Sequence, residues 1–122
     1  MRNLRVLKSG LNAADSDPTS LYSPNEGTKA LLNGILVCNT TSSDATVNIG
    51  IRPRAKAIGG SHGTIVYIAR ETAVPANTTI ELFDGEYPLV NERSLTTYDE
   101  IIAFSTSTTA IDVYVSLLSD VN

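Results

Sequence analysis

The chain's single histidine, His62, follows Ser61 in the glycine-rich stretch "GGSHG". A serine hydrolase needs an imidazole held beside a serine hydroxyl and oriented by an acidic group. Adjacency in the chain does not produce that geometry, and no G-x-S-x-G motif is present to expose a nucleophile. We interpret His62 as a loop residue, and a small hydrolase that uses it is kept as a third functional hypothesis.

Acidic residues occur in close pairs, and carboxylates are the groups that glycosidases and calcium sites use. Glycosidases also need a walled cleft with aromatic platforms, whereas the chain has no Trp, two Phe and five Tyr. No D-x-D-x-D-G calcium loop is present. We therefore predict a protein that is not an enzyme, with no catalytic residue, cofactor or metal site. The pairs are Asp15 with Asp17, Asp84 with Glu86, and Asp99 with Glu100.

Cys38 is the only cysteine, so the chain cannot form an intrachain disulfide. It lies within an apolar run, and we predict that it is buried in the core. No apolar run approaches the length of a membrane span, and the first ten residues lack the apolar region of a signal peptide. We expect synthesis in a cytoplasm and no membrane partner.

The overall charge argues against nucleic-acid binding. The 122 residues carry a formal net charge of −4 with only three lysines, whereas phosphate contacts require a basic stripe. Arg52, Arg54 and Lys56 form a short basic cluster that we interpret as a solvated strand end. Ser and Thr together number 26, and this bias favours strands and turns.

Residues 1–27 differ from the rest of the chain. The stretch "LNAADSDPTSLYSPNEG" contains two prolines and small polar clusters, so we predict an extended N-terminal arm rather than a helix. Leu4 and Val6 are placed to form a short strand or an anchor. Such an arm either wraps its own domain or reaches a neighbour. We assign residues 28–122 to the folded domain.

From residue 28 onward, short runs of β-branched residues alternate with turn signals. In the run from Ala45 to Ile51, every second residue is apolar. We interpret "NTTSSD" and "STSTTA" as hairpin turns and "FDGEYP" as an Asp-Gly turn, and residues 88–98 as a possible site of one helical turn. The fold class is all-β: a single antiparallel β-sandwich, jelly-roll or Ig-like. The predicted strands are 29–39, 45–53, 64–70, 78–83, 100–106 and 110–118.

The second half follows a recognisable order of segments. A strand leads into "PANTT", then a short strand, a Leu-containing connector, the "IIAFS" strand after an Asp, and a closing "VYVS" strand. With "LLNGILVCNTTSSDATVNIGI" upstream, residues 22–118 resemble small β-sandwich virion proteins of tailed bacteriophages, of the head-decoration or tail-attached type. Those proteins often carry Gly-Asp before the "I-x-A" strand, whereas this chain has Tyr98-Asp99-Glu100.

The resemblance implies a non-enzymatic structural component of a bacteriophage virion, assembled in the host bacterial cytoplasm. The favoured role is a capsid decoration (cement) protein that binds the major capsid protein shell or other virion proteins. A homo-oligomer is expected, with a trimer favoured. The alternatives are a tail, neck or baseplate protein and a carbohydrate-binding or adhesion module. The candidate partner-binding residues are Leu4, Val6, Leu21, Tyr22, Ile58 and Tyr87.

Overall fold

The computed structural model describes residues 2–121, with side chains described for residues 3–119. The described part forms no helix that is long and apolar enough to span a membrane. It folds into β-strands: β1 (Arg2–Ser9), β2 (Thr19–Tyr22), β3 (Thr28–Asn39), β4 (Ala45–Ala55), β5 (Val66–Val74), β6 (Thr79–Asn91), β7 (Thr97–Phe104) and β8 (Ile111–Val121).

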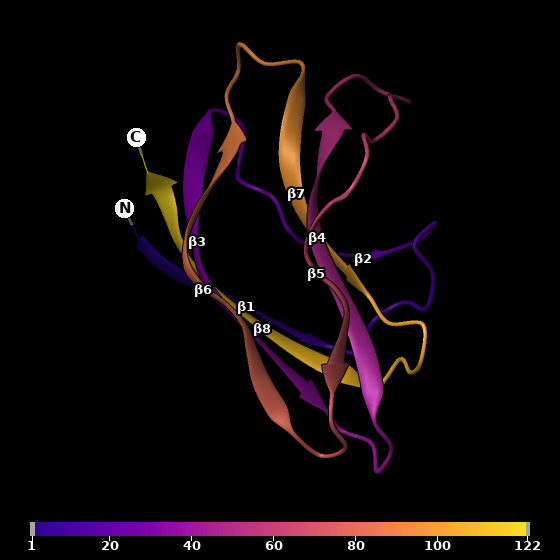
Figure 1. Cartoon of the computed structure of the whole chain (residues 1–122). Helices are drawn as coiled ribbons and strands as arrows, with labels where there is room; N and C mark the ends of the chain where they lie inside the picture. Colours follow the sequence, from indigo (N-terminus) through magenta and orange to yellow (C-terminus); the bar gives the residue numbers. More distant parts are fainter. Residues whose placement is uncertain (1, 122) are drawn as a thin grey trace.

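The strands form two four-stranded sheets that pack face to face (Figure 1). Sheet A has the order β1-β8-β3-β6 and sheet B the order β2-β7-β4-β5, and the neighbouring strands run antiparallel. The predicted all-β sandwich is confirmed. Among the described strands, β4 and β5 are consecutive partners in one sheet, and every other connection crosses between the sheets. This order is that of a jelly roll, because an Ig-like sandwich pairs more of its consecutive strands within a sheet.

The two polar turns predicted as hairpins are instead corners between the sheets. "NTTSSD" carries the chain from β3 in sheet A to β4 in sheet B, and "STSTTA" carries it from β7 to β8. The hairpin prediction was wrong because alternation of apolar residues shows which face of a strand is buried but not which strand lies beside it.

The predicted extended arm is not confirmed. Residues 2–9 form the edge strand β1 beside β8, and residues 19–22 form β2 beside β7. The first 27 residues therefore supply one edge strand to each sheet. The segment wraps its own domain, which is the first of the two behaviours expected for an arm.

Strand β6 is longer than the sequence predicted. It continues through Asp84-Gly85 to Asn91, so there is no Asp-Gly turn and no helical turn in this stretch of the chain. Its register against β3 shifts between the pair Leu32–Tyr87 and the pair Gly34–Asp84. The turn-like residues thus form a β-bulge, which bends a strand without ending it.

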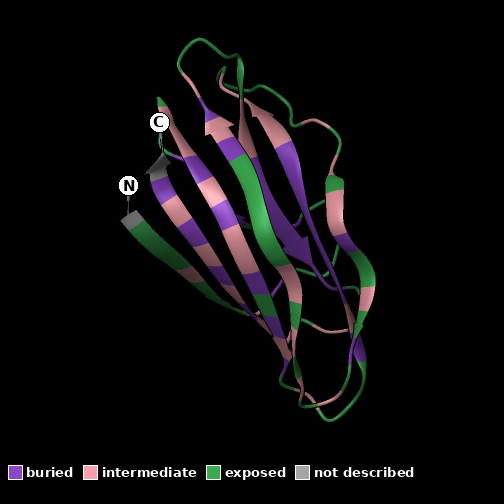
Figure 2. Cartoon of the chain, turned by 60° about the vertical axis from the view of Figure 1, so that its left-hand side comes forward, coloured by how far each residue is buried: buried purple, intermediate pink, exposed green. Residues whose placement is uncertain are grey.

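The core lies between the inner faces of the two sheets. The alternating apolar residues of β4 and β8 are buried as predicted; the purple and pink bands of Figure 2 show this alternation along β8, whereas residues 47–52 of β4 are buried on both faces. Leu32, Ile35 and Val37 on β3 are fully buried, so Cys38 faces outward and is only half-buried. The predicted burial of Cys38 in the core was therefore wrong, because the preceding residues already hold the inward positions.

Candidate interaction surface

Of the residues with potential catalytic chemistry, His62 and Asp15 line one surface pocket, and within the described part of the chain no hydrogen bond or ion pair joins them. His62 is exposed in the segment between β4 and β5, and its Nδ1 lies 3.1 Å from the carbonyl oxygen of the adjacent Gly63. In the part of the chain that the structure describes, no group of three or more His, Cys, Asp or Glu residues is arranged to hold a metal ion. The contacts of His62 are those of a loop residue.

The Asp99–Glu100 pair is split between two roles. Asp99 Oδ2 accepts a hydrogen bond from the backbone N–H of Val90 at 2.9 Å, which ties β7 to β6 in the other sheet. Glu100 instead faces Arg52 on the neighbouring strand. Consecutive strand residues point to opposite faces, so these two carboxylates do not act on one ligand.

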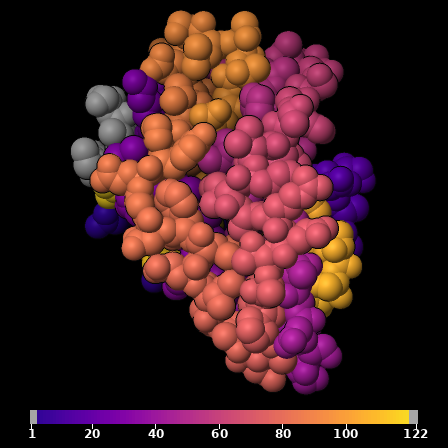
Figure 3. Space-filling model, in the orientation of Figure 1, coloured from indigo at the N-terminus to yellow at the C-terminus, as the bar shows by residue number. Residues whose placement is uncertain are grey.

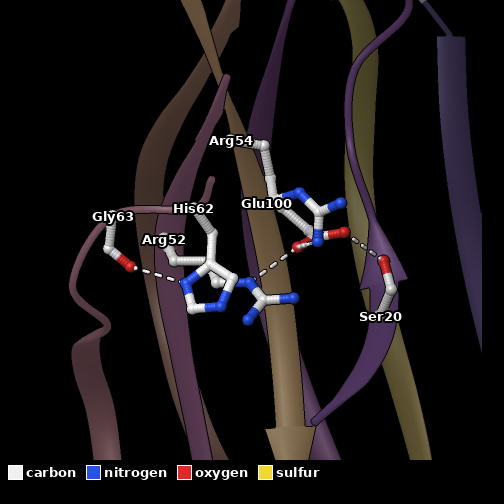
Figure 4. A network of polar contacts seen from close by, with 6 residues as sticks. All are labelled: Ser20, Arg52, Arg54, His62, Gly63 and Glu100. Carbon is white, nitrogen blue, oxygen red and sulfur yellow. Dashed lines mark hydrogen bonds and ion pairs between the residues drawn. The ribbon is translucent and has the colours of Figure 1, made fainter. Parts of the chain in front are cut away.

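Glu100 and Arg52 form a buried ion pair on the outer face of sheet B (Figure 4). Arg52 Nε donates to Glu100 Oε1 at 2.9 Å, and Ser20 Oγ donates to Glu100 Oε2 at 2.7 Å. Arg54 Nη1 lies 3.8 Å from Glu100 Oε1. The network links β2, β7 and β4, so its geometry is that of a structural brace across sheet B.

The solvated basic cluster predicted around Arg52 is wrong for Arg52 itself, whose exposed fraction is 5%. The residue is buried because Glu100 lies directly opposite it in the β4–β7 register and neutralises its charge. The residues lie 48 positions apart in the chain, so no local sequence signal links them.

The chain itself covers part of the outer face of sheet B. A Cβ added to Gly50 would lie 2.6 Å from Cγ2 of Ile65, the last residue of the β4–β5 segment, and 2.7 Å from the carbonyl oxygen of Val66 on the paired strand β5, so the Ile65 side chain lies directly on the sheet here. Ile102 and Phe104 on the same sheet are buried. This face therefore offers little apolar surface to a partner.

The close approach at Gly50 leads to a testable prediction. Gly50→Ala should destabilise the fold by about 2 kcal/mol, because overpacking forces backbone and side chains to shift. Gly34→Ala is the matched control, since its added Cβ would lie at an ordinary 3.4 Å from the Phe83 carbonyl oxygen. Urea unfolding of both variants measures the effect, and equal losses would show that the β4–β5 segment does not lie on Gly50.

The outer face of sheet A is open and carries an apolar groove. Leu7 on β1 and Leu36 on β3 both pair with Tyr114 on β8, so the three side chains form a transverse row. Leu7 is 66% exposed and Leu36 is 37% exposed. The groove has a volume of about 410 Å³ and is also lined by Cys38 and Val113. Of the two outer faces, the outer face of sheet A is therefore the one that presents a row of apolar side chains to solvent.

The candidate partner-binding residues do not gather in one place. Leu4 on β1 is 37% exposed, Tyr87 on β6 is 39% exposed, and Ile58 is fully exposed in the β4–β5 segment. Leu21 is buried in the core, and Val6 and Tyr22 pack against it. Leu4 and Tyr87 lie on opposite edge strands of sheet A.

The sequence did not indicate that Leu7, Leu36 and Tyr114 lie together on one surface. Each is one position out of phase with the inward-facing residues of its strand, so the alternation that locates the core does not indicate it as a contact residue. Large apolar or aromatic residues at outward positions on three strands were the available signal, but their common row appears only once the strand order is known.

Comparisons with known proteins identify no family. No protein-family model matches the chain, and no curated protein matches it. Among solved structures, it is similar to a chain of the T13 IBDV viral particle, with a TM-score of 0.47 and 15% identity over 97% of this chain and 30% of that chain. A chain of infectious bursal disease virus Gx strain gives a TM-score of 0.46 and 15% identity, over 97% of this chain and 31% of that chain.

A third similar structure is the CBM22-1 xylan-binding domain from Paenibacillus barcinonensis Xyn10C, with a TM-score of 0.46 and 12% identity over 95% of this chain and 83% of that chain. The chain thus spans less than a third of the length of the two virus chains. Because all three TM-scores lie below 0.5, these likenesses do not indicate a shared function.

Proposed function

We propose that this protein is a non-enzymatic structural component of a bacteriophage virion that decorates the head by binding the shell of the major capsid protein. The observation that carries the proposal is the asymmetry between the two outer faces. On sheet B the chain itself lies over Gly50, and Ile102 and Phe104 are buried, whereas sheet A leaves Leu7, Leu36 and Tyr114 around an apolar groove.

Three further features support this role. The jelly roll is an architecture that viral capsid and lectin domains use. Exposed apolar side chains provide the anchors that protein interfaces need, and the polar residues Lys8, Thr79 and Asp112 also line the groove. The bacteriophage assignment itself rests on the resemblance of residues 22–118 to small virion β-sandwich proteins.

The decisive experiment is binding to capsids. Purified protein is added to phage heads that lack it, and bound protein is measured by cosedimentation. The wild-type chain should bind saturably, with copies in fixed proportion to the shell protein. If it does not bind heads that lack it, the proposal is wrong.

Leu36→Asp locates the binding face. A carboxylate in the lining of the groove must be desolvated on docking, so affinity for heads should fall at least tenfold. Leu95→Asp is the matched control, because Leu95 is 43% exposed but lies in the connection between β6 and β7. Unfolding curves verify that both variants fold. Equal binding by the two variants would place the capsid contact elsewhere.

A further inference from the structure

Sheet A ends in two edge strands that pair on one side only. β1 pairs with β8, and Figure 2 shows it green over most of its length. β6 pairs with β3 at the other edge, and residues 84–88 of it are exposed. The space-filling view shows β6 at the surface of the molecule, with no other segment lying over it (Figure 3). Two unpaired strand edges are therefore available on the same sheet.

The two edges carry opposite charges. The described charged side chains of β1 are Arg5 and Lys8, and both are exposed. β6 carries Glu81, Asp84 and Glu86, which are also exposed, and contains no basic residue. Among the described residues, none of these five side chains forms an ion pair within the chain. The β1 edge is thus basic, the β6 edge is acidic, and neither charge is neutralised locally.

The register of the sheet places opposite charges at the two ends of one row. Arg5 on β1 pairs with Ser116 on β8. Ser116 pairs with Gly34 on β3, and Gly34 pairs with Asp84 on β6. If sheet A of a second copy continued this sheet at the same level, Arg5 of one copy would be the cross-strand neighbour of Asp84 of the other.

The strand directions also permit this continuation. Successive strands of sheet A alternate in direction, so β1 and β6 run antiparallel to each other. A second copy placed beside the first with the same orientation therefore brings its β1 antiparallel to β6. The N–H of Val90 already donates to Asp99 and Pro88 has no N–H, so the part of β6 left for a partner strand is 79–87. Antiparallel addition of a strand to an open edge is an established mode of protein association.

We propose that copies of this chain associate head to tail, with the basic β1 edge of one copy against the acidic β6 edge of the next. This inference rests on the proposed structural role, for which many copies on a particle are needed, and it names the surface that joins them. A contact between two different surfaces generates a ring when the rotation between copies closes.

The charges also disfavour the two symmetric contacts, in which a β1 edge meets a β1 edge or a β6 edge meets a β6 edge. Two β1 edges would bring basic side chains together, and two β6 edges would bring acidic side chains together, so both symmetric pairings are disfavoured. Charged edge strands otherwise serve to prevent association. Here the two edges carry charges of opposite sign, so the same charges that prevent the symmetric contacts leave the head-to-tail contact favourable.

Sedimentation velocity of the purified chain, without particles, tests the proposal. The wild-type protein should associate reversibly, and association should weaken with added salt because the ion pairs are screened. Arg5→Asp and Asp84→Arg should each weaken association at least fivefold, since each places like charges opposite one another. A wild-type chain that stays monomeric at its highest soluble concentration would overturn the proposal.

The double variant Arg5→Asp/Asp84→Arg reverses both charges and should restore association to near the wild-type level. An equimolar mixture of the two single variants should also associate, because each supplies the charge that the other lacks. Arg93→Asp is the control, since Arg93 is exposed in the β6–β7 connection, outside both edges. If the double variant associates no better than the single variants, Arg5 and Asp84 do not face each other.

The two proposals fail in different ways. Association without binding to phage heads would refute the virion role and leave the edge contact in place. Binding to phage heads by a chain that stays monomeric would support the virion role and refute the edge contact.

Discussion

Replacing Glu100 by alanine should lower the free energy of unfolding by about 3 kcal/mol, because it leaves the buried Arg52 guanidinium without its counter-charge. Arg52 is 5% exposed and Glu100 is 7% exposed, so water cannot readily take the place of the carboxylate. Ser20 Oγ also loses its acceptor. Chemical denaturation monitored by circular dichroism measures the change.

The surface pair Lys29–Glu92 is the matched control, because its N···O distance is also 2.9 Å while its side chains are 45% and 40% exposed. Glu92→Ala should cost about 0.5 kcal/mol or less. The double variant Arg52→Met/Glu100→Leu should lose much less stability than Glu100→Ala, since it leaves no unpaired charge. If the double variant were as unstable as Glu100→Ala, packing rather than the uncompensated charge would explain the loss.

Most strands were predictable because their side chains alternate. In β4, Ala45, Val47, Ile49 and Ile51 all point into the core, as the period of two residues indicates. The same rule separates Val113 and Val115 from Tyr114 on β8. This rule is local, so one sequence was enough for the position and the buried face of these strands.

The sequence did not show which strands lie beside one another, and the wrong predictions of hairpins and of an arm both follow from this. β3 and β4 were expected to form a hairpin, but they belong to different sheets. Residues 1–27 were predicted to form an arm because of their prolines and small polar clusters, with Leu4 and Val6 placed for a short strand or an anchor. The strand structure of β1 comes from pairing with β8, which lies more than 100 residues away in the chain.

The candidate interaction surface also depends on which strands lie side by side. Leu7, Leu36 and Tyr114 form one row only because β1, β8 and β3 are neighbours. Arg5 and Asp84 share a row only through the complete order of sheet A. The sequence predicted a structural role with binding to a partner, but the candidate surface proposed for that role follows from long-range strand order.

The corner between β3 and β4 depends on one buried side chain. Asn39 is 0% exposed, and its Nδ2 donates to the carbonyl oxygens of Ser43 at 2.7 Å and Val74 at 3.0 Å. Its Oδ1 accepts from the Thr41 backbone N–H at 2.9 Å and from Thr41 Oγ1 at 2.7 Å. The amide is satisfied on both sides and fixes the direction in which the chain leaves sheet A.

Asn39→Asp should therefore destabilise the protein by about 3 kcal/mol although the side chain keeps its shape, because a carboxylate cannot donate to either carbonyl and is costly to bury. Asn33→Asp, a half-buried position on the same strand, should stay within about 0.5 kcal/mol of wild type. Thermal and urea unfolding at neutral pH compare the two. Similar stability in both variants would mean that the donated hydrogen bonds of Asn39 do not hold the corner, and that the polar turn folds from its backbone alone.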